Sequence, residues 1–275
     1  MSHQASFRRR GLEQAARDER AGFVFSCPHD VPRCSRLIDV LLGHRIRVEE
    51  LAAGLELEGR IYDPAWSWFV PIDQPRYLLV RSLFETVTDF TETTFYDVST
   101  WTLPLAFGAR FDAVARDDLA RGVRGAELVA PLEPAGRFEA DPEAYAYFLD
   151  WRSYFAPRTL RRLLEAGFDA RVAERPLVAS TSDGRRGFGP GTIVVPLGDG
   201  ERRAELEDLL AGAARQDGVE IWATGSGLTP DGVDLGSPRV HPLTMPRPAL
   251  VVGRDVSTYE EGETWHLLEE RFGFE

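Results

Sequence analysis

The chain has 275 residues, of which 43% are apolar and 28% are charged, as in an ordinary soluble globular protein. Its formal net charge of -12 argues against a nucleic-acid partner, because sequence-independent affinity for a phosphate backbone comes from basic surface. The sequence has no run of 18 or more apolar residues, so we expect no membrane-spanning segment.

The first predicted segment covers residues 1–20. Within it, residues 7–20 have the spacing of a weakly amphipathic helix with few apolar side chains, so we expect this helix to lean on another surface. The basic start of the chain has no apolar stretch after it, which is not typical of a secretory signal. The first strand is expected to begin after Gly22.

One pattern occurs twice along the chain. Residues 23–48 and 145–172 each have the order strand, turn, helix and strand, because a short apolar run is followed by Pro, a helical spacing and a Gly. The match continues to Pro71 and Pro196, which are separated by 125 positions. A duplication of about 75 residues is too long for a solenoid repeat and indicates paired half-domains.

These half-domains define the expected fold class. We predict an α/β fold in which residues 21–85 and 143–223 form two duplicated, flavodoxin-like units with a mainly parallel sheet. The helix of each copy carries leucine and isoleucine side chains at helical spacing, which predicts a buried face rather than a cofactor site.

The loop after the first strand holds Cys27, His29 and Asp30, at the edge where open parallel sheets bind ligands. A Cys beside a His suggests a nucleophile, since a thiolate needs a nearby base or cation. The alternative is a packed cysteine, because adjacent residues on an extended turn point apart. With Cys34 as the only other cysteine, neither a disulfide framework nor a zinc site is indicated, and the redox compartment stays open. The matching loop of the second copy has different residues, Asp150, Trp151 and Tyr154.

Further candidate ligand-lining residues follow the Val-Pro turns. Asp73 and Gln74 in the first copy, and Asp199 in the second, lie where a strand ends and a helix begins. Backbone amides at such a helix start can hold an anion. N-capping of the two helices by Asp73 and Asp199 is the alternative that we favour.

Residues 86–142 separate the two copies and are too apolar for a mobile linker. We predict that this connecting segment packs across the two halves. An exposed aromatic binding platform is the alternative. The side chains expected to be buried are Trp101, Leu103, Leu105 and Phe107.

Residues 224–245 form a loop dense in Gly and Pro whose glycines lack the spacing of a phosphate-binding loop. A strand of the buried type, Ala249–Val252, comes next. Ser257 and Glu260 form a capping-box pattern, and Gly273 ends the predicted helix. Residues 246–275 therefore predict the strand and helix of a third α/β unit that is truncated.

Three segments resemble a known protein family: residues 95–108, 226–237 and 256–268. They are similar to the region downstream of the peptidase domain in large bacterial zinc carboxypeptidase-like proteins. In that family a carboxypeptidase A-like domain comes first and a class I glutamine amidotransferase-like domain follows. The resemblance implies that these two domains are partners of this chain, with a peptide as substrate of the whole protein. It also implies that residues 246–275 begin the amidotransferase-like domain, so the half-domains are expected to be of that type.

The catalytic residues of the family do not carry over. Its zinc site needs a His, a Glu three residues later and a distant second His, because these ligands leave one position open for water. Only His266 and Glu269 have this spacing, and no later His completes the set. The amidotransferase cysteine would fall beyond residue 275.

The resemblance thus implies a noncatalytic accessory region of a zinc carboxypeptidase-like hydrolase, without a metal or cofactor in this chain. Zinc would belong to the full-length family member, and such a protein would be exported; otherwise we expect a cytoplasmic location. The alternative is a stand-alone α/β small-molecule-binding module or an enzyme that uses the loop of Cys27, His29 and Asp30.

Overall fold

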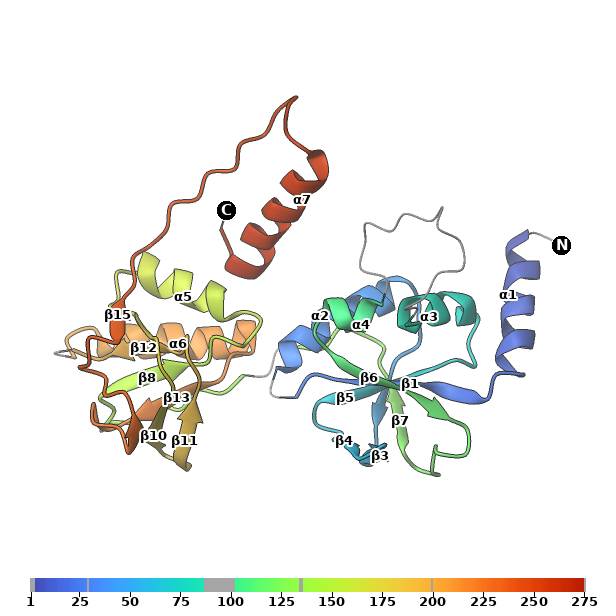
Figure 1. Cartoon of the computed structure of the whole chain (residues 1–275), viewed down its shortest axis with the longest axis horizontal. Coiled ribbons are helices and arrows are strands. Elements are labelled where there is room, and N and C mark those ends of the chain that lie inside the picture. The colour runs from blue at the N-terminus through green and yellow to red at the C-terminus, as the bar shows by residue number, and fades with distance from the viewer. Residues whose placement is uncertain (1–2, 29, 87–101, 134–135, 199, 275) are drawn as a thin grey trace. The chain divides into compact units, whose positions relative to one another are not determined.

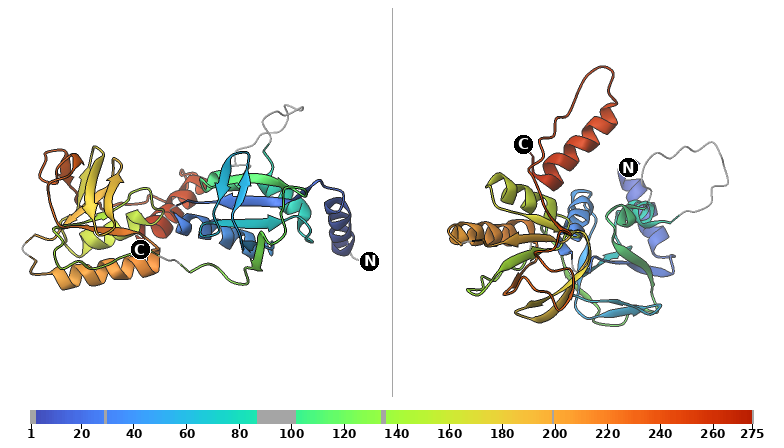
Figure 2. Two further views of the ribbon diagram at one scale, coloured as in Figure 1. Left: turned by 90° about the horizontal axis from the view of Figure 1, so that it is seen from below. Right: turned by 60° about the vertical axis from the view of Figure 1, so that its left-hand side comes forward.

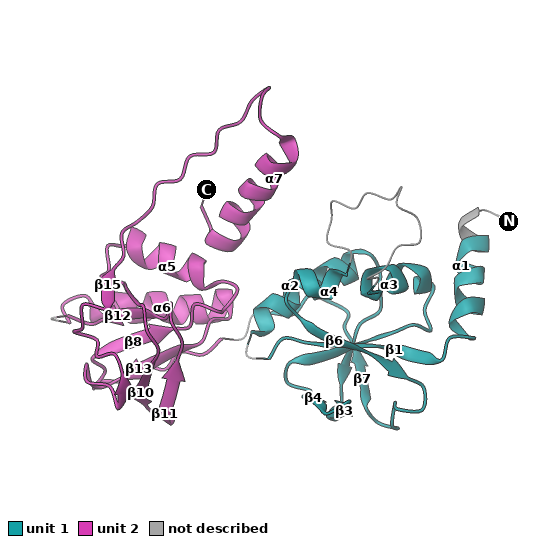
Figure 3. Cartoon of the chain, in the orientation of Figure 1, with its two compact units in different colours: residues 1–133 teal, residues 134–275 magenta. Residues whose placement is uncertain are grey.

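The computed structural model describes residues 3–28, 30–86, 102–133, 136–198 and 200–274. The chain divides into two compact units, Met1–Glu133 and Pro134–Glu275 (Figure 3). Each unit contains its own five-stranded sheet and its own hydrophobic clusters. In the described ranges, no helix has the length and apolar character needed to cross a membrane.

Unit 1 is built around a sheet with the strand order β6-β1-β5-β2-β7, in which all neighbours are antiparallel. Figure 1 shows this sheet with helices α2 and α3 on one side of it. Helix α2 connects β1 to β2, and both strands flank β5. This is the split βαβ motif of ferredoxin-like domains, with β7 added at one edge. The elements are α1 (His3–Ala15), β1 (Arg20–Ser26), α2 (Val31–Gly43), β2 (Glu49–Leu51), β3 (Leu55–Leu57), β4 (Arg60–Tyr62), β5 (Ser67–Pro71), α3 (Tyr77–Phe84), α4 (Leu103–Ala106), β6 (Arg110–Ala115) and β7 (Arg124–Glu127).

Unit 2 repeats this topology. Its five-stranded sheet has the order β13-β8-β12-β9-β15, so each strand takes the place of its counterpart in unit 1. The register matches as well, since Pro71 lies opposite Gly22 and Pro196 lies opposite Ala146. The elements are β8 (Ala146–Leu149), α5 (Ala156–Glu165), β9 (Arg171–Ala173), β10 (Leu177–Thr181), β11 (Gly184–Phe188), β12 (Ile193–Pro196), α6 (Arg203–Asp217), β13 (Ile221–Thr224), β14 (Asp231–Gly232), β15 (Val240–Pro242), α7 (Thr258–His266) and the π-helix η1 (Leu267–Phe272).

The prediction of a mainly parallel, flavodoxin-like or amidotransferase-like sheet is wrong. Every strand pairing among the described residues of the two five-stranded sheets is antiparallel. β1 and β2 run parallel to each other, as the strand-helix-strand pattern suggests, but β5 lies between them. The sequence cannot show this insertion, because it depends on where the third strand of the motif pairs.

Burial on both sheet faces explains why the sequences of these strands are like those of parallel strands. Continuous apolar runs are typical of strands covered on both faces, which is the usual condition of parallel sheets. In unit 1, Phe23 and Phe25 pack with α2 and α3, whereas Val24 and Phe69 pack with the β3–β4 hairpin on the other face. The hairpin therefore supplies the second cover that a helix layer supplies in a parallel fold.

The same two covers exist in unit 2. Tyr147 and Leu149 pack with α5 and α6, and Phe148 packs with residues of the β10–β11 hairpin. Figure 2 shows α6, in orange, and this hairpin, in yellow, on opposite sides of the sheet. Both faces of each central strand are thus buried.

The connecting segment of residues 86–142 does not form a separate layer in its described part. It supplies α4, β6 and β7 to unit 1, and Leu103 and Phe107 pack partly buried against the core of that unit. Leu105 is 56% exposed, so its predicted burial is wrong. Trp101 lies outside the described residues.

The helix of residues 7–20 ends earlier than predicted, at Ala15, and leans on α3 through Gly11 and Ala15. Near the other end of the sequence, residues 249–252 form no strand, and Val251 is 75% exposed. The apolar strand predicted there is therefore wrong.

The helix predicted after this stretch is confirmed. The hydroxyl of Ser257 accepts a hydrogen bond from the backbone N–H of Glu260, as the capping-box pattern indicates. Gly273 in the left-handed conformation ends η1. The helix pair is held to unit 2 because η1 packs on α5, where Arg158 forms an ion pair with Glu270.

Candidate functional site

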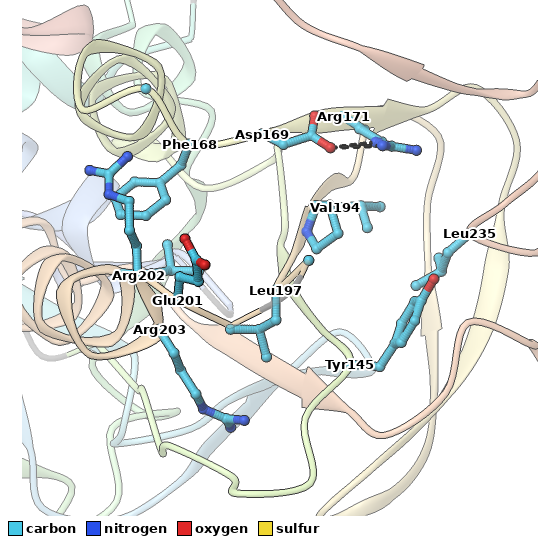
Figure 4. A pocket seen from close by; sticks show the side chains of 14 residues that line it. Tyr145, Phe168, Asp169, Arg171, Val194, Leu197, Glu201, Arg202, Arg203 and Leu235 are labelled. Atoms are coloured by element: carbon cyan, nitrogen blue, oxygen red, sulfur yellow. Dashed lines mark hydrogen bonds and ion pairs between the residues drawn. The ribbon is translucent and has the colours of Figure 1, made fainter.

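A cavity of about 520 Å³ lies in unit 2 where β12 ends and α6 begins. Val194 and Leu197 lie between its two sides. Tyr145 and Leu235 form one side, and Phe168 forms the other (Figure 4). This volume is within the range of sites that hold small molecules, and such sites combine apolar surface with a few polar groups.

Charged side chains surround this apolar surface in compensated pairs. Arg171 binds Asp169 at 2.7 Å, and this hydrogen bond raises the pKa of the guanidinium group. Arg202 lies 4.2 Å from the centre of the Phe168 ring and binds Glu205 at 2.6 Å. Guanidinium groups on aromatic faces combine a charge with a flat contact surface, so the rim can meet both polar and aromatic parts of a ligand.

A third arginine is fixed by a chain of hydrogen bonds. Arg203 binds Glu207 at 2.8 Å, and the hydroxyl of Tyr147 donates to the same carboxylate at 2.7 Å. Burial raises the pKa of Tyr147 to about 12, with a further contribution from Glu207. Tyr147 therefore stays protonated near neutral pH and holds Glu207, and through it Arg203, in place.

In unit 1 the residue Gln74 follows β5, as the loop of Gly198 follows β12 in unit 2. Gln74, only 2% exposed, accepts a hydrogen bond from the backbone N–H of Arg47 at 2.7 Å and donates to the carbonyl of Pro71. Asp73 forms an ion pair with Arg47 at 2.5 Å. Two of the predicted ligand-lining residues therefore join the segments that flank β2 and β5.

The predicted N-capping role of Asp73 is wrong. The residue at the N-cap of α3 is Arg76, and it makes no side-chain capping bond. In unit 2 the N-cap of α6 is Arg202, also without such a bond, while Asp199 lies outside the described residues. Asp73 is instead neutralised by Arg47, because that guanidinium group reaches it across the ends of the strands.

The nucleophile suggested for Cys27 is excluded by a disulfide bond to Cys34, which the sequence analysis did not predict. The bridge joins the end of β1 to the first turn of α2, and both cysteines are buried. Asp30 binds Arg33 at 2.8 Å, and His29 lies outside the described residues. A disulfide bond and an ion pair thus hold the loop after β1 in place.

The matching loop of unit 2 also has structural contacts. Asp150 binds Arg152 at 2.6 Å, and although burial opposes this, the hydrogen bonds from Arg152 lower the pKa of Asp150. Trp151 packs against Gly191. The carbonyl of Tyr154 accepts a hydrogen bond from Arg271 of η1. None of these three residues lines the cavity.

The cavity residues Tyr145, Phe168 and Arg171 were missed by sequence reasoning. They belong to separate segments and become neighbours only through the strand order. The one available signal was the Gly198–Gly200 loop at the start of α6, since Gly198 does line the cavity.

Across the ranges that the structure describes, no three His, Cys, Asp or Glu side chains are grouped so that they could hold a metal ion. His266 and Glu269, which have the zinc-motif spacing, are both exposed. Comparisons with models of known families, with curated proteins and with solved structures found no match for this chain.

Proposed function

We propose that unit 2 is a small-molecule-binding module and that its ligand occupies the cavity between Tyr145 and Phe168. The observation that supports this most directly is the cavity of about 520 Å³ at the start of α6, which combines apolar side chains with carboxylates and guanidinium groups. At the end of β5 in unit 1, Gln74 instead bonds to the backbone of Arg47 and Pro71.

The charge pattern favours a zwitterionic ligand with an apolar side chain, such as an aromatic amino acid. Carboxylates of Asp169 and Glu201 and guanidinium groups of Arg171 and Arg202 line the same cavity. An ammonium group can be met by the carboxylates and a carboxylate group by the arginines, since charge-assisted hydrogen bonds are the stronger ones. Phe168 and Leu197 then contact the side chain of the ligand.

Isothermal titration calorimetry with three related probes tests this proposal. The probes are L-phenylalanine, phenylacetate and 2-phenylethylamine, which share an aromatic ring and differ in charge. We expect L-phenylalanine to bind about tenfold more tightly than either singly charged probe, a difference of about 1.4 kcal/mol. Equal affinity for the three probes would contradict the zwitterion, and no heat of binding for any of them at about 10 mM would contradict the site.

Variants test whether the ligand binds in the cavity of unit 2. Leu197→Trp fills the cavity and should abolish binding, whereas Leu105→Trp makes the same change at an exposed leucine of unit 1 and should have no effect. Arg171→Gln should weaken L-phenylalanine binding several-fold, with Arg239→Gln as its control, because Arg239 forms a similar ion pair outside the cavity. Circular dichroism is used to check that each variant is folded.

A second candidate function is that of a noncatalytic accessory region of a zinc carboxypeptidase-like hydrolase. The sequence resemblance supports it, and so does the apolar stretch of residues 250–252, since Val251 and Val252 are 75% and 60% exposed. Contiguous exposed apolar side chains are typical of surfaces that another domain covers. The two functions are compatible.

The accessory function is tested with the isolated peptidase domain of a zinc carboxypeptidase-like protein. We expect the chain to change the peptide-hydrolysis rate of that domain and Val251→Asp to remove the change. Val129→Asp is the control, because Val129 is 93% exposed and lies outside the stretch. Hydrolysis that is unaffected by the chain would count against the accessory function.

A further inference from the structure

Two helices in different units carry exposed apolar side chains and opposite charges. α1 presents Phe7, 50% exposed, and Leu12, 43% exposed, next to a run of three arginines at positions 8–10. α7 presents Tyr259, 84% exposed, and Trp265, 61% exposed, beside Glu260 and Glu261 in its first turn. α1 therefore combines apolar side chains with a net positive charge, and α7 combines them with a net negative charge.

Helix α7 lacks the packing that normally stabilises so short a helix. All of its nine residues are described, and none of them is buried. Isolated helices shorter than about 12–15 residues are marginal in water, because helical stability in proteins comes mainly from packing of one face. Contact through η1 holds one end of the helix pair to α5, but the α7 side chains have no cover of their own.

The negative charge of α7 favours a positively charged surface as its partner. The whole chain has a net charge of -12, so most of its surface repels an acidic helix. α1 has the opposite charge, because its consecutive arginines Arg8, Arg9 and Arg10 are all exposed. α1 therefore offers α7 a surface of complementary charge.

We propose that α1 of one copy of this chain docks on α7 of a second copy. Phe7 and Arg10 lie three positions apart on one side of α1, so an aromatic side chain of α7 would contact Phe7 while a glutamate of α7 faces Arg10. The contact joins two different surfaces, so a single contact leaves the α1 of one copy and the α7 of the other unused. A reciprocal second contact between these two helices closes a two-fold dimer, and contacts with further copies give a ring or an open chain. This inference is independent of the cavity ligand.

Sedimentation equilibrium on the full chain tests this docking. We expect the average mass to rise with protein concentration above that of the monomer at about 20 mM NaCl. Association should weaken about tenfold at about 500 mM NaCl, because exposed charges are screened within a few ångströms at that salt concentration. A mass that stays monomeric at both salt concentrations would overturn the proposal, as would association that salt leaves unchanged.

Charge-reversal variants test whether α1 and α7 are the two surfaces that bind each other. The double variant Arg8→Glu/Arg10→Glu and the double variant Glu260→Arg/Glu263→Arg should each lose self-association. An equimolar mixture of the two should associate again, since each reversed helix then meets an opposite charge. The control Arg121→Glu/Arg175→Glu makes the same net charge change at exposed positions outside both helices and should associate like the original chain. Failure of the mixture to associate would exclude α1 and α7 as partners.

Discussion

The side-chain oxygen of Gln74 accepts a hydrogen bond from the backbone N–H of Arg47 at 2.7 Å, while its amide nitrogen donates to the carbonyl of Pro71. One buried side chain thus joins the segment before β2 to the end of β5. Both partners are backbone groups, and each would lose a hydrogen bond without this side chain.

Replacing Gln74 by Ala should therefore destabilise unit 1. We expect a loss of about 2–3 kcal/mol in the free energy of unfolding, since buried backbone groups left without partners cost about 1–3 kcal/mol. Urea unfolding followed by circular dichroism measures it. Gln216→Ala is the control, because Gln216 is exposed on α6 and should change stability by less than about 0.5 kcal/mol. Equal effects of the two changes would contradict the closing role of Gln74.

The Cys27–Cys34 bridge should contribute about 2–3 kcal/mol to the stability of unit 1. This follows from the loop entropy that a bridge with a sequence separation of 7 removes from the unfolded chain. We expect a reducing agent to lower the urea midpoint of the original chain. Reducing agent should leave the Cys27→Ala/Cys34→Ala variant unchanged. Thiol titration of the unfolded, unreduced protein should give no thiol, and two thiols per chain would show that the bridge does not form.

The sequence was informative about local structure. The duplication is visible because buried positions repeat at a nearly constant offset, and it corresponds to two sheets of identical strand order. The capping pair Ser257 and Glu260 marks a real helix start, since a capping box involves only four consecutive residues. Such features need no knowledge of distant neighbours.

Pairing across the chain could not be predicted in the same way. The apolar runs of β1 and β5 show that both strand faces are buried, but not whether a helix or a hairpin covers the second face. Two cysteines seven residues apart do not show by themselves that they meet. Tyr145, Phe168 and Arg171 converge only because β8, β9 and β12 are adjacent, so the cavity depends on the strand order.

Asp217 links two helices of unit 2. Its fully buried carboxylate accepts hydrogen bonds from Arg162 at 2.8 Å and from Arg158 at 3.4 Å. Asp217→Ala should lower the free energy of unfolding by about 3 kcal/mol, because breaking a buried ion pair leaves the remaining charges without compensation. Thermal and urea unfolding measure the change. Asp208→Ala serves as the control, since Asp208 is exposed on the same helix. A loss no larger than that of the control would show that the arginines find other partners.

Asp18 should make the stability of unit 1 depend on pH. Hydrogen bonds from Arg20, and one from the hydroxyl of Tyr77 at 2.9 Å, hold the pKa of this carboxyl well below its usual range, although burial opposes them. A lowered folded-state pKa contributes stability above the unfolded-state pKa of about 3.9, and this contribution is lost as pH falls toward the folded-state pKa.

Asp18→Asn should therefore be less stable than the original chain at pH 7, by about 1 kcal/mol once solvent screening is included. The difference should shrink as the pH falls from about 5 to about 2, because protonation then removes the same charge from the original carboxyl. Urea midpoints measured across this pH range give the comparison. Tyr77→Phe keeps the Arg20 bonds and removes one hydroxyl, so it should show a smaller change with the same pH trend. A difference between Asp18→Asn and the original chain that stays constant from pH 7 to pH 2 would mean that Asp18 acts through its shape and not its charge.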